Sequence, residues 1–441
     1  MRKLINCKLL FLCPFLLAAC GNENDPTPSI PPANQPDAIE LGVTAGVTLT
    51  KAAVTANTGL TGGIAVYAGL QGSATTPNVD PYTSTLKNNY AIYTGSTGAW
   101  TNSSTTDKIY LTSQTATIFA HYPAYKPTAS GDDKGALVTS AGTALKASET
   151  SNKISAASTV DISVFPGKSG GINTNNYLDP STSNAELVWN TSNNKWEDKK
   201  DANKNVIISA PGEVDYMWGS ETSTAKQPVT SNGKAAGNSS HNGSVALEMN
   251  HALAMVSFRI YNDGTYKNAG MLTKIQLRNK SSYADLHNGG TTPTMKISDG
   301  TITDGTSPAA VTYTRFIDTD GSGTPSGYTL VKIGSADAAG VVSSTITGTT
   351  TGGKAEAAAA STKFSIMVLP VSGKASQNVE AVFTIDGADY PVALGTSGSD
   401  LTWAKGNNYL YTAKLSGKEL SITSVTVAEW GDGGNNDLVV N

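Results

Sequence analysis

The strongest structural signal in this sequence is an alternating segment near the N-terminus, residues 39–49. Apolar side chains take every odd position, and polar residues or glycine take the even ones. The apolar residues are Ile39, Leu41, Val43, Ala45, Val47 and Leu49. Because successive side chains of a β-strand point to opposite faces, this period of two predicts a strand with one buried face.

The rest of the chain has the composition of an all-β protein. Ser, Thr, Gly, Ala and Asn are abundant, and only 15% of the 441 residues are charged. Short alternating segments between Gly, Asn and Asp turns predict many strands joined by long polar loops. The further predicted strands are residues 64–67, 90–93, 109–111, 116–120, 161–165, 214–218, 256–260, 275–277, 364–369, 379–385, 409–415 and 421–430. Residues 354–360 hold the best helical candidate, and residues 126–152 and 173–205 are predicted as exposed loops.

The N-terminus has the pattern of an exported lipoprotein. Residues 1–19 combine a basic start with a mostly apolar run, as a secretory signal peptide does. The run is shorter than the roughly 20 apolar residues of a spanning helix. It ends in Leu-Ala-Ala before Cys20, which resembles a bacterial lipobox. We therefore expect cleavage before Cys20, lipid on its thiol and anchoring in the outer membrane.

This cleavage limits the chemistry of the mature chain. The three cysteines, Cys7, Cys13 and Cys20, all lie at or before the cut, so no internal disulfide and no thiolate metal site is expected. Losing three basic residues and no acid changes the formal net charge from −4 to −7. A mildly acidic surface argues against nucleic acid as a partner.

Several tracts distributed along the chain resemble the fimbrillin family of Bacteroidales type V pilus subunits. Their order and spacing carry the resemblance more than any one of them does. They are the lipobox and residues 118–123 (IFAHYP), 214–218 (VDYMW), 251–256 (HALAMV), 367–370 (MVLP), 383–390, 403–411 and 427–430 (VAEW). The resemblance implies two β-sandwich domains of transthyretin-like topology with long polar loops.

The resemblance also implies an assembly mechanism. A lipidated precursor keeps its first strand in a groove of its own N-terminal domain, a trypsin-like surface protease cuts after this strand, and a strand from another copy replaces it. The expected parts are a signal peptide at 1–19, a lipidated tether with a removable first strand at 20–51, an N-terminal β-sandwich at 52–245 and a C-terminal β-sandwich with a donor tail at 246–441.

The cut and the donor tail have candidate residues. Lys51 follows the alternating segment after one residue, Thr50, so cleavage is expected between Lys51 and Ala52, although Lys51 is also an acceptable solvated turn residue. The tail is expected within residues 431–441, where a Gly- and Asn-rich spacer precedes Leu438, Val439 and Val440. The alternative for these three residues is a frayed terminus or an edge strand of their own domain.

No catalytic residue, cofactor site or metal site is predicted. Gly167-Lys168-Ser169 lacks the upstream glycine of a phosphate-binding loop, and the acidic loop from Asp318 has Thr329 where a calcium loop needs glutamate. The four histidines are not at ligand spacing and are expected to be hydrogen-bonded structural groups. They are His121, His241, His251 and His287.

The sequence thus predicts a structural shaft subunit of a surface pilus that supports adhesion, with copies of itself and other pilus subunits as partners. The alternative is a tip or accessory adhesin that binds host glycans or proteins. Its candidate sugar-stacking aromatics, in or near loops, are Trp100, Tyr177, Trp189 and Trp196, which could equally pack against their own loops.

Overall fold

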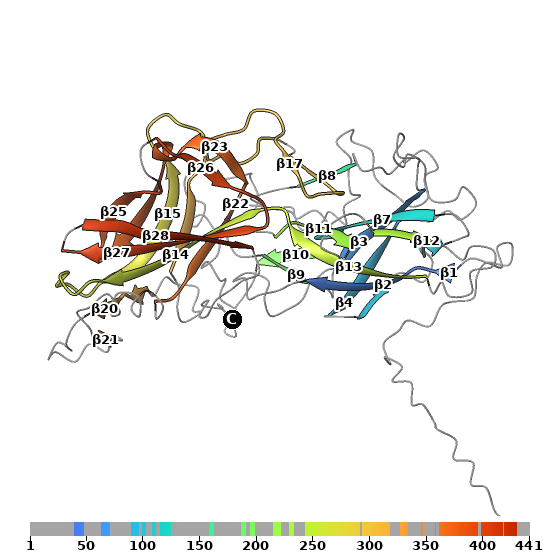
Figure 1. Ribbon diagram of the computed structural model, residues 1–441, viewed down its shortest axis with the longest axis horizontal. Helices are drawn as coiled ribbons and strands as arrows, with labels where there is room; N and C mark the ends of the chain where they lie inside the picture. The colour runs from blue at the N-terminus through green and yellow to red at the C-terminus, as the bar shows by residue number, and fades with distance from the viewer. Residues whose placement is uncertain are drawn as a thin grey trace, which may run out of the picture.

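The structure is a computed structural model of the chain. It describes residues 39–47, 63–70, 90–96, 99–102, 108–111, 115–124, 158–162, 187–190, 195–198, 215–221, 229–232, 243–317 except 292, 327–333, 345–346, 358, 361–417 except 396 and 397, and 419–429. Within these residues nearly all regular structure is β, which confirms the predicted fold class. Figure 1 shows the sheets in two groups along the long axis of the molecule.

The first group is an eight-stranded sheet in the order β11-β13-β2-β5-β4-β3-β7-β12. Its strands are β2 (Gly42–Val47), β3 (Ile64–Leu70), β4 (Tyr90–Ser96), β5 (Ala99–Asn102), β7 (Thr115–Tyr122), β11 (Met217–Glu221), β12 (Val229–Asn232) and β13 (Ser244–His251). β11 pairs with β7 as well as with β13, so seven of the strands form a closed ring. A short pair, β1 (Ile39–Glu40) with β6 (Tyr110–Leu111), adjoins β2.

The second group has a six-stranded and a five-stranded sheet. The first contains β14 (Ala254–Asn262), β20 (Val331–Ile333), β21 (Thr345–Ile346), β22 (Phe364–Val368), β27 (Asn407–Ser416) and β28 (Glu419–Glu429). The second contains β15 (Met271–Asn279), β18 (Tyr313–Phe316), β19 (Tyr328–Thr329), β24 (Val379–Ile385) and β25 (Ala388–Ala393). A further pair is β23 (Val371–Ala375) with β26 (Asp400–Trp403), and a 3-10 turn, η2, spans Ser376–Asn378.

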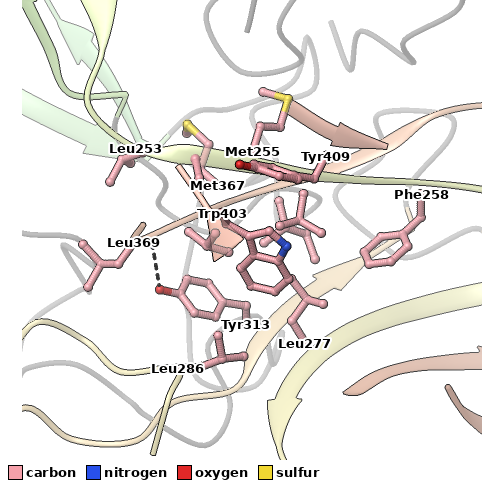
Figure 2. Packing of buried hydrophobic residues seen from close by; sticks show 14 of the residues in the cluster. Leu253, Met255, Phe258, Leu277, Leu286, Tyr313, Met367, Leu369, Trp403 and Tyr409 are labelled. Carbon is pink, nitrogen blue, oxygen red and sulfur yellow. Dashed lines mark hydrogen bonds between the residues drawn. The ribbon is translucent and has the colours of Figure 1, made fainter. Parts of the chain in front are cut away.

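The core of the second group is rich in aromatic side chains. Phe258 of β14 meets Phe383 of β24 edge to face, with ring centroids 5.2 Å apart, so the two larger sheets share one apolar interior. Trp403 is fully buried in this interior and donates to the Tyr411 hydroxyl. Figure 2 shows Trp403 at the centre of the cluster, near Tyr313, whose hydroxyl accepts from the Leu369 amide.

The two groups are joined in more than one place. β13 ends at His251 and β14 begins at Ala254, so the chain changes sheet across two buried residues. The expected boundary after residue 245 falls inside β13, six residues earlier. In addition, β8 (Thr159–Asp161) pairs with β16 (Thr294–Lys296), which also pairs with β17 (Ile302–Thr303), so segments from both halves of the sequence share a sheet.

Most predicted strands match observed ones within a few residues, but one predicted loop contains a strand pair, and most of the helical candidate lies outside the described residues. Part of the expected loop 173–205 is a hairpin of β9 (Leu187–Asn190) and β10 (Lys195–Asp198). β22 is buried along its whole length, and among the described strands it pairs with β14 alone. Of the helical candidate 354–360 only Ala358 lies within the described residues.

Candidate functional site

The candidate site is the place in the closed ring that is occupied by residues 39–47, which contain β1 and β2 and are called the first strand below. β2 runs parallel to β13 over six paired positions, from Gly42 opposite Ser244 to Val47 opposite Met249. On its other side β2 meets β5 where Val43 lies opposite Trp100. Figure 1 shows β2 and β13 side by side. We call the surroundings of residues 39–47, formed by β13, β4, β5 and residues 108–111, the strand slot.

The inward side chains of the first strand belong to the core of the ring. Leu41 and Val43 are each 1% exposed and Ala45 is 2% exposed. They belong to one apolar cluster with Ile64, Val66 and Leu247, among others. Burying a Leu or Val side chain contributes about 1.5–3 kcal/mol, so these contacts hold the strand firmly.

The strand slot also binds the backbone of the first strand. The Tyr93 hydroxyl donates to the Leu41 carbonyl (2.8 Å), and the Trp100 indole N–H donates to the Ala45 carbonyl (2.9 Å). The Leu41 amide donates to the Ile109 carbonyl (2.8 Å). Burial, with a smaller effect from the charge of Glu40, raises the pKa of the Tyr93 phenol, so this hydroxyl keeps its proton and stays a donor. Carbonyls are common to all sequences, so these bonds hold any strand in the right position.

One charged contact stands at the entrance of the first strand. The Lys108 ammonium lies 2.9 Å from a Glu40 carboxylate oxygen, with the two side chains 24% and 16% exposed. Because partial burial reduces screening by water, this ion pair favours an acidic side chain at the position before Leu41.

The strand slot contains residues that sequence reasoning did not assign to it. Tyr93, Lys108 and Ile109 lie more than 50 positions from the residues of the first strand that they contact, and nothing in their local pattern reveals this contact. Trp100 was a candidate for sugar stacking. It is instead 2% exposed and packed beside the first strand, so that interpretation of Trp100 is wrong.

The other predicted site residues are only partly described. Ile39 lies in β1 and Val47 in β2, and their side chains fall outside the description. Cys20, Leu49, Lys51, Ala52 and the tail residues Leu438, Val439 and Val440 lie outside the described residues.

The histidines that the structure describes are hydrogen-bonded, as predicted. The buried His121 ring contacts the Pro123 carbonyl through Nδ1 and the Tyr67 hydroxyl through Nε2, each at 3.1 Å. Burial lowers the pKa of His121 to about 3, so the ring is neutral. His251 contacts the buried Asp215 carboxylate (2.9 Å), and His287 lies 3.5 Å from Asp304. His241 is outside the described residues.

The described residues hold neither a metal-ligand group nor a membrane-spanning helix. They contain no group of three or more His, Cys, Asp or Glu side chains placed to hold a metal ion. Within the same residues, no helix is long and apolar enough to cross a membrane.

Comparison with known proteins gives one match to a family and several structural similarities. No protein with a curated description matches the chain in sequence. The similar solved structures include a fimbrial protein from Bacteroides vulgatus (14% identity, 89% of this chain and 99% of that chain covered, TM-score 0.45). They also include a fimbrial assembly protein from Parabacteroides distasonis (9%, 89% and 99%, 0.32) and the tip fimbrial protein Mfa3 from Porphyromonas gingivalis (10%, 89% and 100%, 0.33).

The family match covers most of the chain in sequence. The model of the family described as fimbrillin-like matches residues 147–430, which is more than half of the 441 residues. The chain therefore belongs to the fimbrillin-like family.

Proposed function

We propose that this fimbrillin-like pilus subunit forms the shaft of a surface fimbria by exchanging its first strand. The precursor is exported as a lipoprotein anchored through Cys20, and a trypsin-like protease then cuts after Lys51. The first strand leaves the strand slot, and residues from the C-terminal tail of another copy enter it. The observation that carries the proposal is the seating of residues 39–47, which combines buried side chains with sequence-independent backbone bonds.

The physical chemistry of the strand slot supports exchange. Departure of the first strand leaves the six paired positions of β13 with unpaired backbone groups beside an apolar trough. An open edge of this kind is a template for another strand of matching pattern. While the first strand stays in place it prevents premature assembly, because the same hydrogen bonds and the same apolar surface are already used.

The position of the strand in the chain favours removal over a purely structural role. The first strand comes before every other described strand in sequence. A cut behind it therefore severs one chain connection and leaves the other ring strands β3, β4, β5, β7, β11 and β13 on a single chain.

The experiment is a limited digestion of the purified precursor with trypsin. We expect one early cut between Lys51 and Ala52, followed by a ladder of multimers that resists detergent and collapses on heating. Lys51→Ala is the matched control and should remain monomeric under the same digestion. A confirmed cut at Lys51 without any multimers would refute the shaft function.

A further inference from the structure

The first strand and the C-terminal tail share a five-residue chemical pattern. Residues 40–44 read Glu-Leu-Gly-Val-Thr, and residues 437–441 read Asp-Leu-Val-Val-Asn. Each segment has an acid, then Leu, one intervening residue, Val and a small polar residue. The intervening position faces away from the core, because Gly42 is half-buried while its two neighbours, Leu41 and Val43, are buried on the opposite face.

Three features of the strand slot bind the matching positions. Lys108 pairs with the acid at position 40, and the apolar cluster encloses the side chains at positions 41 and 43. The Tyr93 hydroxyl holds the carbonyl at position 41. A second segment with the same pattern would satisfy all of these groups without moving them.

We propose that the tail of a second copy enters the strand slot parallel to β13, in the register that puts Asp437 against Lys108, Leu438 in the place of Leu41 and Val440 in the place of Val43. The inference rests on the proposed strand exchange and makes it specific. Lys108 becomes the residue that selects the register, and Tyr93 positions the incoming backbone.

Other registers are disfavoured by burial of polar groups. A slip of one residue puts the Asp437 carboxylate into the fully buried place of Leu41 or removes it from Lys108. A slip of two residues puts Asn436 into the place of Leu41, or moves Asp437 beyond the reach of Lys108. Burying an unpaired amide or carboxylate costs several kcal/mol, so the charge and the apolar pattern choose the same register.

Cross-linking tests the register directly. In this register Asn441 takes the place of Thr44, whose partner on β13 is the exposed Ala246. Paired Cα atoms of neighbouring strands lie about 4.8 Å apart, within the range of about 4.4–6.8 Å that a disulfide spans. Trimmed subunits contain no other cysteine. We expect Ala246→Cys with Asn441→Cys to form disulfide-linked multimers, at least fivefold more than the control pair Ala246→Cys with Val439→Cys, which matches a slip of two residues.

Charge reversal tests the role of Lys108. A chain with Lys108→Glu and Glu40→Lys keeps the ion pair of the precursor but repels Asp437 after trimming. We expect the rate of polymerisation to fall by a factor of about 5–30, which corresponds to a loss of about 1–2 kcal/mol in the binding of the incoming tail. The further change Asp437→Lys should restore the rate.

These outcomes distinguish a failure of the proposed function from a failure of the proposed register. If trimmed wild-type subunits form no multimers, the proposed function fails. If they form multimers but link preferentially through the Val439 variant, or polymerise equally well with the charge of Lys108 reversed, the function stands and the proposed register is overturned.

Discussion

Leu41→Ala should destabilise the precursor and leave the assembled fibre unchanged. Leu41 is 1% exposed, and its removal loses apolar contacts in the ring core. Leu-to-Ala changes at such sites cost about 3 kcal/mol, which lowers the melting temperature of a unit of this size by about 6–12 °C. After trimming, the first strand is gone, so polymers of the variant should melt with the wild-type polymer.

Scanning calorimetry of precursor and purified polymer measures this difference. Leu247→Ala is the matched control, because Leu247 is buried in the same cluster but lies on β13, which stays in the subunit. It should lower the melting temperature of both forms. If Leu41→Ala lowers that of the polymer as much as that of the precursor, the first strand has not been exchanged and the reasoning is refuted.

Three further predictions concern the tail, a buried histidine and the turn between β24 and β25. Deletion of residues 431–441 should leave trimmed subunits monomeric on size-exclusion chromatography, and addition of an untruncated trimmed subunit should yield short capped species. The pKa of His121 falls from 6.5 to about 3 on folding, so the unfolded state binds a proton first as the pH falls through 6.5. The free energy of unfolding should drop by about 2 kcal/mol between pH 7 and 5 from this group, and His121→Gln should remove that part of the decline in urea titrations. Asp386 accepts from the Gly270 and Met271 amides and from the Tyr266 hydroxyl, so Asp386→Ala should cost about 3 kcal/mol and Asp386→Asn distinctly less in guanidinium unfolding.

The sequence predicted the faces of the strands better than their partners. The odd-numbered pattern of residues 39–49 correctly indicates which side chains of the first strand are buried, since Leu41, Val43 and Ala45 all lie in the core. The pattern is silent on the neighbour of β2. Its partner, β13, lies about 200 residues away and runs parallel, and alternation along one strand carries no information about direction or distance.

Two predictions were wrong because the contacts that decide the structure lie outside the local sequence. The polar neighbours of Trp100 in sequence indicate a loop residue, but its burial is decided by the first strand, which lies more than 50 positions away. The β9–β10 hairpin was hidden within a segment of polar composition, although four residues between Leu187–Asn190 and Lys195–Asp198 are a common hairpin loop. Composition predicted a loop there, and cross-strand pairing overrode it.

The parallel alignment of β2 with β13 has a mechanical consequence for a filament built by strand exchange. Tension pulls an inserted strand along its own axis, so the hydrogen bonds between the two strands are loaded in shear together and none has to break before the others. β13 continues through two buried residues into β14, so the pull passes along one backbone into the second group of sheets. The joint between subunits and the joint within each subunit therefore lie on a single line of force.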